Sequence, residues 1–324
     1  MNDKNTLYIV VPCYKEEAVL PETSRQLREK MTQLMAEGKI SRDSRVMFVN
    51  DGSQDQTWPI ISRLHKEEPN LFSGVNLSRN RGHQNALLAG LLTAVNFADM
   101  IISMDADLQD DINAVDAMVD AYHEGYDIVY GVRSKREKDT FFKRFTAEGF
   151  YKVMRALGVD IVFNHADYRL MSRRAVEGLE EFTEVNLFLR GIVPQIGYKW
   201  TTVTYERAER FAGESKYPLK KMLAFAADGI TSFSVKPIRL VFSCGFIIFL
   251  VSLIMFIYAL AVKAAGHSTN GWASLMASIW MLGGIQLLGL GIVGEYIGKI
   301  YNETKRRPRY IIESVLNKSK TEDA

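Results

Sequence analysis

The sequence has little cysteine and no apolar stretch at its beginning. Only two cysteines, Cys13 and Cys244, occur in 324 residues, so a framework of disulfide bonds is not expected. The chain opens with the polar residues MNDKNT, and we therefore expect no secretory signal peptide. The net charge of +2 argues neither for nor against nucleic acid as a partner. The lack of a disulfide framework is what we expect of a protein at a cytoplasmic face.

Charged residues are absent from a long stretch in the last third of the chain. No Asp, Glu, Lys, Arg or His occurs from Leu240 to Val262, and from Ala264 to Gly294 only His267 interrupts a second apolar run. Each run is long enough to cross a bilayer as a helix of about 20 residues. We therefore predict two transmembrane helices within residues 240–298, followed by a basic cytoplasmic tail over 299–324.

The segments next to these runs carry positive charge. Residues 216–239 mix lysines with apolar side chains and are expected to lie along the membrane surface. A second amphipathic segment spans 139–158, although its aromatic residues fit a protein core equally well. The loop between the apolar runs, KAAGHSTNGW, has only one lysine, Lys263. The positive-inside rule therefore predicts that both termini are cytoplasmic in a multi-pass membrane protein.

The N-terminal part, residues 1–215, alternates apolar runs with helical spacing. Strands are predicted at 7–12, 45–50, 71–78, 99–104 and 127–132, and helices at 18–38, 83–98 and 113–125. Strands that alternate with helices indicate an α/β domain with a mainly parallel sheet covered on both faces.

Polar clusters follow four of these strands: PCYKEE, NDGSQD, LSRNRGHQ and DADLQDD. Ligands of such sheets bind at the carboxyl ends of the strands. Asp105 and Asp107 would face one crevice if the strand continued through Ala106, and paired carboxylates suit a divalent cation that also binds phosphate. The alternative is that aspartates cap the following helix, which we expect for Asp110 and Asp111.

The ordered motifs resemble those of a known family. Eight motifs occur in this order: PCYKEE, NDGSQDQT, LSRNRGHQNALLAG, DADLQDD, YGVR, DYRLMSRR, FLRG and RFAGESKY, and two apolar runs follow them. From Leu7 to about Tyr310, this arrangement resembles the family 2 polyprenyl-phosphate glycosyltransferases. Among these, the bactoprenol-phosphate glucosyltransferases are most similar, and dolichol-phosphate mannose synthases are relatives. The resemblance implies a GT-A fold, a UDP-sugar donor, undecaprenyl phosphate as acceptor in a lipid bilayer, and Mg²⁺ or Mn²⁺. It also implies a possible homo-oligomer, such as a tetramer, and no nucleic acid.

The resemblance assigns residues to the donor side of the site. They are Pro12, Tyr14, Glu16, Asp51, Asp105, Gln109, Arg210 and Lys216, with Asp105 and Asp107 as metal ligands. Simpler interpretations remain open, because Pro12 and Glu16 fit a strand end and a helix start, and Asp51 fits a turn. His83 begins a predicted helix whose N–H groups can face an anion, and we assign it no catalytic role.

The resemblance also assigns residues to the acceptor side. Arg133 matches the arginine that binds the acceptor phosphate, although a surface arginine is the alternative. Asp167 matches a catalytic base or a group that orients the acceptor. A phosphate monoester, with a second pKa of about 6, is already largely ionised, so a strong base is not required. The alternative for Asp167 is an ion pair with Arg169 or Arg173.

We therefore predict an inverting glycosyltransferase that moves a sugar from a UDP-sugar to polyprenyl phosphate at the cytoplasmic leaflet, for modification of cell-envelope glycans. A polysaccharide-extending transferase would normally carry a QxxRW motif, which this sequence lacks. A channel or flippase component with a regulatory nucleotide-binding domain is the alternative from another class, but two spans leave little room for a pore. The motifs do not specify the sugar.

Overall fold

The computed structural model of the protein describes residues 5–134, 165–185, 188–206 and 271–317, with short stretches between 238 and 258. The chain divides into two compact units. The first comprises Met1–Tyr151, Asp160–Tyr217 and Arg307–Ala324, and the second comprises Lys152–Val159 and Pro218–Arg306. The chain therefore leaves the first unit, forms most of the second, and returns to the first.

One sheet organises the first unit. In the described residues its strands are β1 (Leu7–Cys13), β2 (Arg45–Asn50), β3 (Phe72–Leu77), β4 (Met100–Ser103), β5 (Ile128–Arg133), β6 (His165–Ser172), β7 (Trp200–Tyr205) and β8 (Ile312–Leu316). Their order across the sheet is β7-β5-β6-β4-β1-β2-β3-β8. The five strands predicted from the sequence, β1 to β5, lie within one residue of their expected bounds.

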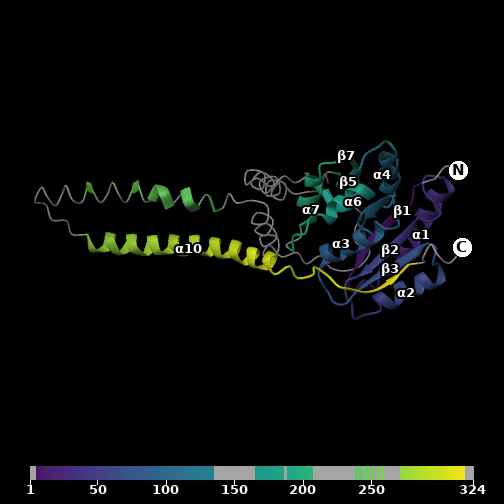
Figure 1. The fold of residues 1–324 in the computed structure, drawn as a ribbon, viewed down its shortest axis with the longest axis horizontal. Helices are drawn as coiled ribbons and strands as arrows, with labels where there is room; N and C mark the ends of the chain where they lie inside the picture. The colour runs from purple at the N-terminus through teal and green to yellow at the C-terminus, as the bar shows by residue number, and fades with distance from the viewer. Residues whose placement is uncertain are drawn as a thin grey trace, which may run out of the picture. The chain divides into compact units, whose positions relative to one another are not determined.

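The sheet is mostly parallel, as predicted, with antiparallel additions. β1 pairs in parallel with both β2 and β4, β2 with β3, and β5 with β7. β6 runs antiparallel between β4 and β5. β8 runs antiparallel along β3 and is the yellow strand near the C-terminus in Figure 1. The sequence had indicated only a basic tail in this region, so β8 was not expected.

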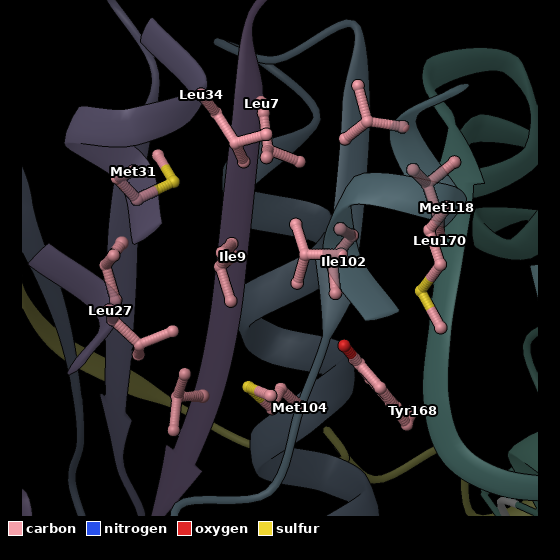
Figure 2. Close-up of a cluster of buried hydrophobic side chains, with 14 of the residues drawn as sticks. Leu7, Ile9, Leu27, Met31, Leu34, Ile102, Met104, Met118, Tyr168 and Leu170 are labelled. Carbon is pink, nitrogen blue, oxygen red and sulfur yellow. The ribbon is translucent and has the colours of Figure 1, made fainter. Parts of the chain in front are cut away.

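Helices cover both faces of the sheet. They are α1 (Leu20–Ala36), α2 (Thr57–Glu67), α3 (His83–Ala94), α4 (Ala114–His123), α6 (Arg173–Glu180), and the short α7 (Leu189–Ile192) with the 3₁₀ turn η1 (Val193–Ile196). Leu27, Met31 and Leu34 of α1 share a buried cluster with β1 and α4 (Figure 2). Burial of each such side chain contributes about 1.5–3 kcal/mol.

The other face of the sheet packs against α3. Gly90 of α3 lies so close to the sheet that an added Cβ would be 2.4 Å from Val10 Cγ1 and 2.6 Å from Val49 Cγ2. Only glycine fits this approach without a shift. The contact sets the position of α3, and therefore of His83 at its start, over the ends of β1 and β2.

The second unit contains the long helix α10 (Trp272–Thr304). Within it, Met281–Thr304 is long and apolar enough to cross a membrane. None of the residues in the most apolar stretch of this segment is buried. A Cβ on Gly289 of α10 would lie 3.1 Å from Val241 Cγ1, so a residue of the first apolar run approaches this helix. Among the described residues α10 is the only candidate span, and the predicted pair of transmembrane helices is not confirmed.

Candidate active site

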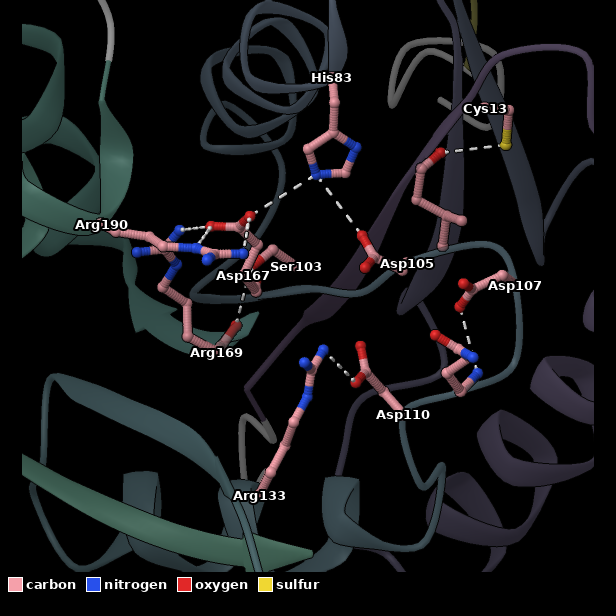
Figure 3. A network of polar contacts seen from close by, with 12 residues as sticks. Cys13, His83, Ser103, Asp105, Asp107, Asp110, Arg133, Asp167, Arg169 and Arg190 are labelled. Carbon is pink, nitrogen blue, oxygen red and sulfur yellow. Dashed lines mark hydrogen bonds and ion pairs between the residues drawn. The ribbon is translucent and has the colours of Figure 1, made fainter. Parts of the chain in front are cut away.

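The loops that follow β1 to β4 lie at the carboxyl edge of the sheet, where we expected the polar clusters to meet. β4 ends at Ser103, and Leu108 has a left-handed φ of 56°. The strand therefore does not continue through Ala106, and the alternation expected to align Asp105 with Asp107 is absent. Instead, Asp107 Oδ1 accepts a hydrogen bond from the Gln109 backbone N–H at 3.2 Å. The two carboxylates sit on one turn with different contacts (Figure 3).

His83 connects two acidic residues across the edge. Its Nε2 lies 3.5 Å from Asp105 Oδ1 and 3.9 Å from Asp167 Oδ2 (Figure 3). It is the first residue of α3 and follows Gly82, whose φ of 86° lets the chain turn into the helix. The sequence had given His83 no catalytic role, and the structure places it in the middle of the cluster.

Asp105 lies in a concentration of negative charge. The pKa of its carboxyl is raised to about 6, first of all by burial and also by the charges of Asp110, Asp167 and Asp107, while His83 opposes the rise. Such a group is stabilised in its charged form by a cation. Among the described residues no cluster of three His, Cys, Asp or Glu side chains forms a complete metal cage. One or two carboxylates suffice for Mg²⁺ that is also bound by substrate phosphates, so the residues present fit that kind of site.

Asp167 is a buried ion-pair partner of two arginines. Its Oδ1 accepts from Arg169 at 3.0 Å, and its two oxygens accept from Arg190 at 3.2 and 3.0 Å. Burial raises the pKa of Asp167, but the charges of Arg190 and Arg169 outweigh it and hold that pKa well below its usual value. Arg173 pairs with Asp99 instead. Of the two open interpretations, the geometry favours an ion pair, with Arg169 and not Arg173.

Arg133 extends from the end of β5 toward the same turn. Its guanidinium lies 3.8 Å from Asp110 Oδ1, and its Nε donates to the Tyr205 hydroxyl at 3.3 Å. The Tyr205 hydroxyl in turn donates to Asp110 at 2.5 Å. Asp110 therefore does not cap α4, contrary to expectation, because it is buried against Tyr205. Asp111 does accept from the Asn113 backbone N–H at 2.9 Å, directly before α4.

A cavity of about 390 Å³ opens beside this cluster. It is lined by residues at or after the ends of β1, β2 and β3, by one residue of α2 and by one of β8: Tyr14, Asn50, Gly52, Ser53, Gln54, Trp58, Asn76, Leu77, Ser78, Arg79, Asn80 and Glu313. The lining combines two aromatic rings with amides, hydroxyls and charges. Such a mixture suits a heterocyclic base and a ribose.

The loop after β3 joins the cavity to the acidic cluster. Arg79 and Asn80 line the cavity, and His83 contacts Asp105. Asp51 holds this loop, because its two oxygens accept from the backbone N–H groups of Arg81 at 2.6 Å and Gly82 at 2.9 Å. Burial raises the pKa of Asp51, and these two hydrogen bonds oppose the rise.

The remaining predicted donor residues have different surroundings. Tyr14 is 44% exposed and lines the cavity. Pro12 is buried within β1 opposite Val49. The Glu16 backbone begins the turn into α1, since its carbonyl accepts from the N–H of Leu20 at 2.9 Å.

Two predicted residues and two predicted segments cannot be compared. Arg210 and Lys216 lie outside the described residues, as do the amphipathic segments 139–158 and, apart from the last residues, 216–239.

Three residues of this edge had no catalytic or binding role assigned from the sequence: His83, Arg190 and Glu313. Arg190 belongs to the FLRG motif, which was noted only as part of the resemblance. The Arg190 guanidinium, on the short helix α7, pairs with Asp167 of β6. No local sequence pattern predicts this tertiary contact.

The comparisons with known proteins agree with this fold. Residues 8–179 match the model of glycosyl transferase family 2, and residues 236–300 match the model of the GtrB C-terminal hairpin. The fold is GT-A-like, and the chain belongs to glycosyl transferase family 2.

Individual relatives extend over nearly the whole chain. The uncharacterized glycosyltransferase YkoT of Bacillus subtilis is 55% identical over 95% of this chain and 91% of that protein. The prophage bactoprenol glucosyl transferase homolog of Escherichia coli is 40% identical over 95% of this chain and 98% of that protein. Among solved structures, glucosyl-3-phosphoglycerate synthase from Mycobacterium tuberculosis has 18% identity and a TM-score of 0.43, over 70% of this chain and 78% of that one.

Proposed function

We propose that this glycosyltransferase moves a hexose from a UDP-sugar to a polyprenyl phosphate, and that undecaprenyl phosphate is the acceptor. Family membership supports the group transfer. The bactoprenol glucosyl transferases at about 40% identity support the lipid acceptor, and they make glucose the first sugar to test.

One observation carries the donor assignment. The cavity at the ends of β1, β2 and β3 and the carboxylates after β4 lie along the same sheet edge, joined by the loop that runs from Arg79 to His83. A nucleoside diphosphate is an elongated ligand with an aromatic base at one end and negative charge at the other. The base and ribose would occupy the cavity, and the diphosphate would lie toward Asp105.

Asp105 and Asp107 would hold a divalent cation, Mg²⁺ or Mn²⁺. When bound there, the cation neutralises charge that develops on the departing diphosphate. The His83 imidazole, 3.5 Å from Asp105, restricts the orientation of that carboxylate. The helix dipole at the start of α3 would add partial positive charge at the same edge.

The acceptor phosphate would bind between Arg133 and Arg190. Arg190 is 34% exposed while its partner Asp167 is buried, so the ion pair orients a guanidinium that still reaches solvent. One phosphate oxygen attacks the anomeric carbon as the bond to the UDP oxygen breaks, which inverts that carbon. The attacking oxygen is already an anion, so Asp167 acts as a positioning residue for Arg190 and need not accept a proton.

The second unit would anchor the enzyme at the cytoplasmic leaflet. The match to the GtrB C-terminal hairpin and the apolar helix α10 support a membrane anchor. The basic residues that flank the two apolar runs support cytoplasmic termini. A membrane anchor keeps the soluble donor and the lipid acceptor at one surface.

The direct test uses the full chain in membranes with undecaprenyl phosphate and a panel of radiolabelled nucleotide sugars. A new glycolipid in the organic extract, formed with UDP-glucose and released by mild acid, supports the proposal. No glycolipid with any UDP-sugar contradicts it. Movement of a preformed glycolipid across the bilayer of vesicles, without synthesis of new glycolipid, would instead identify a flippase component.

A further inference from the structure

Strand β8 contributes a carboxylate to the cavity. Glu313 lines it, and the Asn76 side-chain amide donates to Glu313 Oε2 at 2.8 Å. Asn76 in turn accepts from the Asn50 amide at 2.7 Å. This chain of hydrogen bonds ties the C-terminal strand to residues at the ends of β2 and β3.

The pairing of β8 with β3 is interrupted at Glu313. Val75 pairs with Val315 and Asn76 with Ser314, but Leu77 pairs with Ile312. Glu313 is therefore an extra residue opposite no partner, which defines a β-bulge. Bulges often lie beside binding sites, where they redirect a side chain. Here the bulge lies at the edge of the cavity and allows Glu313 to reach Asn76.

The sheet order restricts what Glu313 can bind. Between β4, which leads to Asp105, and β8 lie β1, β2 and β3. A carboxylate accepts hydrogen bonds and repels phosphate, so Glu313 suits the end of the ligand that is far from the diphosphate. Among the described residues no hydrogen bond to its Oε1 is found. Since Glu313 lines the cavity, that oxygen can accept an N–H or O–H from the end of a ligand that is far from the diphosphate.

We propose that Glu313 determines nucleoside specificity by accepting a hydrogen bond from the donor, either from the imide N–H of the base or from a ribose hydroxyl. This inference rests on the proposed UDP-sugar donor. It makes the C-terminal strand part of the donor site, although the strand lies beyond the membrane helix in the sequence.

The substitution that tests this is Glu313→Gln in the full-length protein in detergent. The glutamine oxygen still accepts from Asn76, while its NH₂ group presents a donor where the carboxylate presented an acceptor. We expect the Kd of UDP, measured by calorimetry, to rise about tenfold, since a hydrogen bond to a charged group is lost. The melting temperature without ligand should not change.

A matched variant and three ligand analogues identify the contact. Glu124→Gln removes a carboxylate from the exposed end of α4, outside the cavity, and should leave UDP affinity unchanged. The penalty of Glu313→Gln should disappear for the analogue that lacks the contacted group: 2′-deoxy-UDP, 3′-deoxy-UDP or N3-methyl-UDP.

Several outcomes overturn the assignment. If Glu313→Gln binds UDP as the wild type does, Glu313 has no role in binding, while the UDP-sugar proposal stands. If Glu313→Gln loses the same affinity for UDP and for all three analogues, and its melting temperature is lower, the role of Glu313 is only to stabilise the pairing of β8. If the wild-type protein binds no uridine nucleotide, the proposed donor is wrong and the Glu313 assignment is wrong with it.

Discussion

Asp107 is the residue whose charge we expect to matter most for turnover. Asn at this position keeps the oxygen that accepts from the Gln109 N–H at 3.2 Å, so Asp107→Asn should fold normally. Loss of its charge should reduce metal-dependent turnover by about a hundredfold or more. The measurement is turnover against Mg²⁺ or Mn²⁺ concentration, with the melting temperature alongside.

The control is Asp43→Asn, an exposed aspartate that precedes β2 at the opposite edge of the sheet. It should retain full turnover. Wild-type activity and an unchanged metal dependence in Asp107→Asn would remove this residue from the proposed metal site.

Asp167 is expected to stabilise the fold more than it transfers protons. Its removal leaves Arg169 buried without its partner, and breaking such a pair costs about 3–5 kcal/mol. Asp167→Asn should therefore lower the free energy of unfolding strongly at pH 7. It should also reduce the turnover rate by a factor that does not depend on pH between about 6 and 9.

The pH dependence of stability provides a second measurement for Asp167. Its pKa is lower in the folded state than in the unfolded chain, so its contribution is present above about pH 4 and declines as the pH falls toward the folded value. The stability difference between wild type and Asp167→Asn should accordingly shrink in acid. A rate deficit that vanishes at high pH, with no loss of stability, would restore the catalytic-base interpretation.

At the scale of elements, the close approach of α3 to the sheet positions the start of that helix. A Cβ on Gly90 would lie 2.4 Å from Val10, so Gly90→Ala should displace α3 and lower stability by about 1–3 kcal/mol. UDP affinity should fall with it, because α3 begins at His83. Chemical denaturation and UDP calorimetry measure both effects.

Gly178→Ala in α6 is the comparison for this change. The nearest atom to its added Cβ is 3.2 Å away, on the Ile196 side chain, which has room to shift. Its cost should be clearly smaller. Equal stability of the wild type and Gly90→Ala would show that α3 adjusts its distance from the sheet freely.

Local patterns of apolar and polar residues predicted the strands and helices whose sequence signals span only a few neighbouring residues. Alternation of apolar strands and helices was enough for β1 to β5 and for the edge at which polar loops meet. β6 and β8 were missed because their partners lie far away in sequence: Ile102 pairs with Leu170, and Val75 with Val315. The alternation expected for Asp105 and Asp107 is absent because β4 ends at Ser103, before both aspartates.

At the scale of the whole molecule, the chain crosses from the catalytic unit into the second unit and returns. Arg307–Ala324 belongs to the first unit, and β8 within it adds both the edge beside β3 and Glu313. Removal of everything after Pro237 would therefore eliminate the membrane segment and a strand of the catalytic sheet together. Such a truncation cannot separate anchoring from catalysis.

A variant that retains β8 makes this separation possible. We would replace residues 238–306 with a Gly/Ser linker of about 30 residues, whose ends average about 30 Å apart, and compare it with a chain that stops at Pro237. The linker variant should bind UDP nearly as tightly as the full protein but use long-chain undecaprenyl phosphate poorly, because it no longer stays at the bilayer. The shorter chain should be less stable and bind UDP weakly. If both variants bind UDP equally, β8 is dispensable for the donor site. If the linker variant uses long-chain undecaprenyl phosphate as well as the full protein does, the second unit is not the anchor.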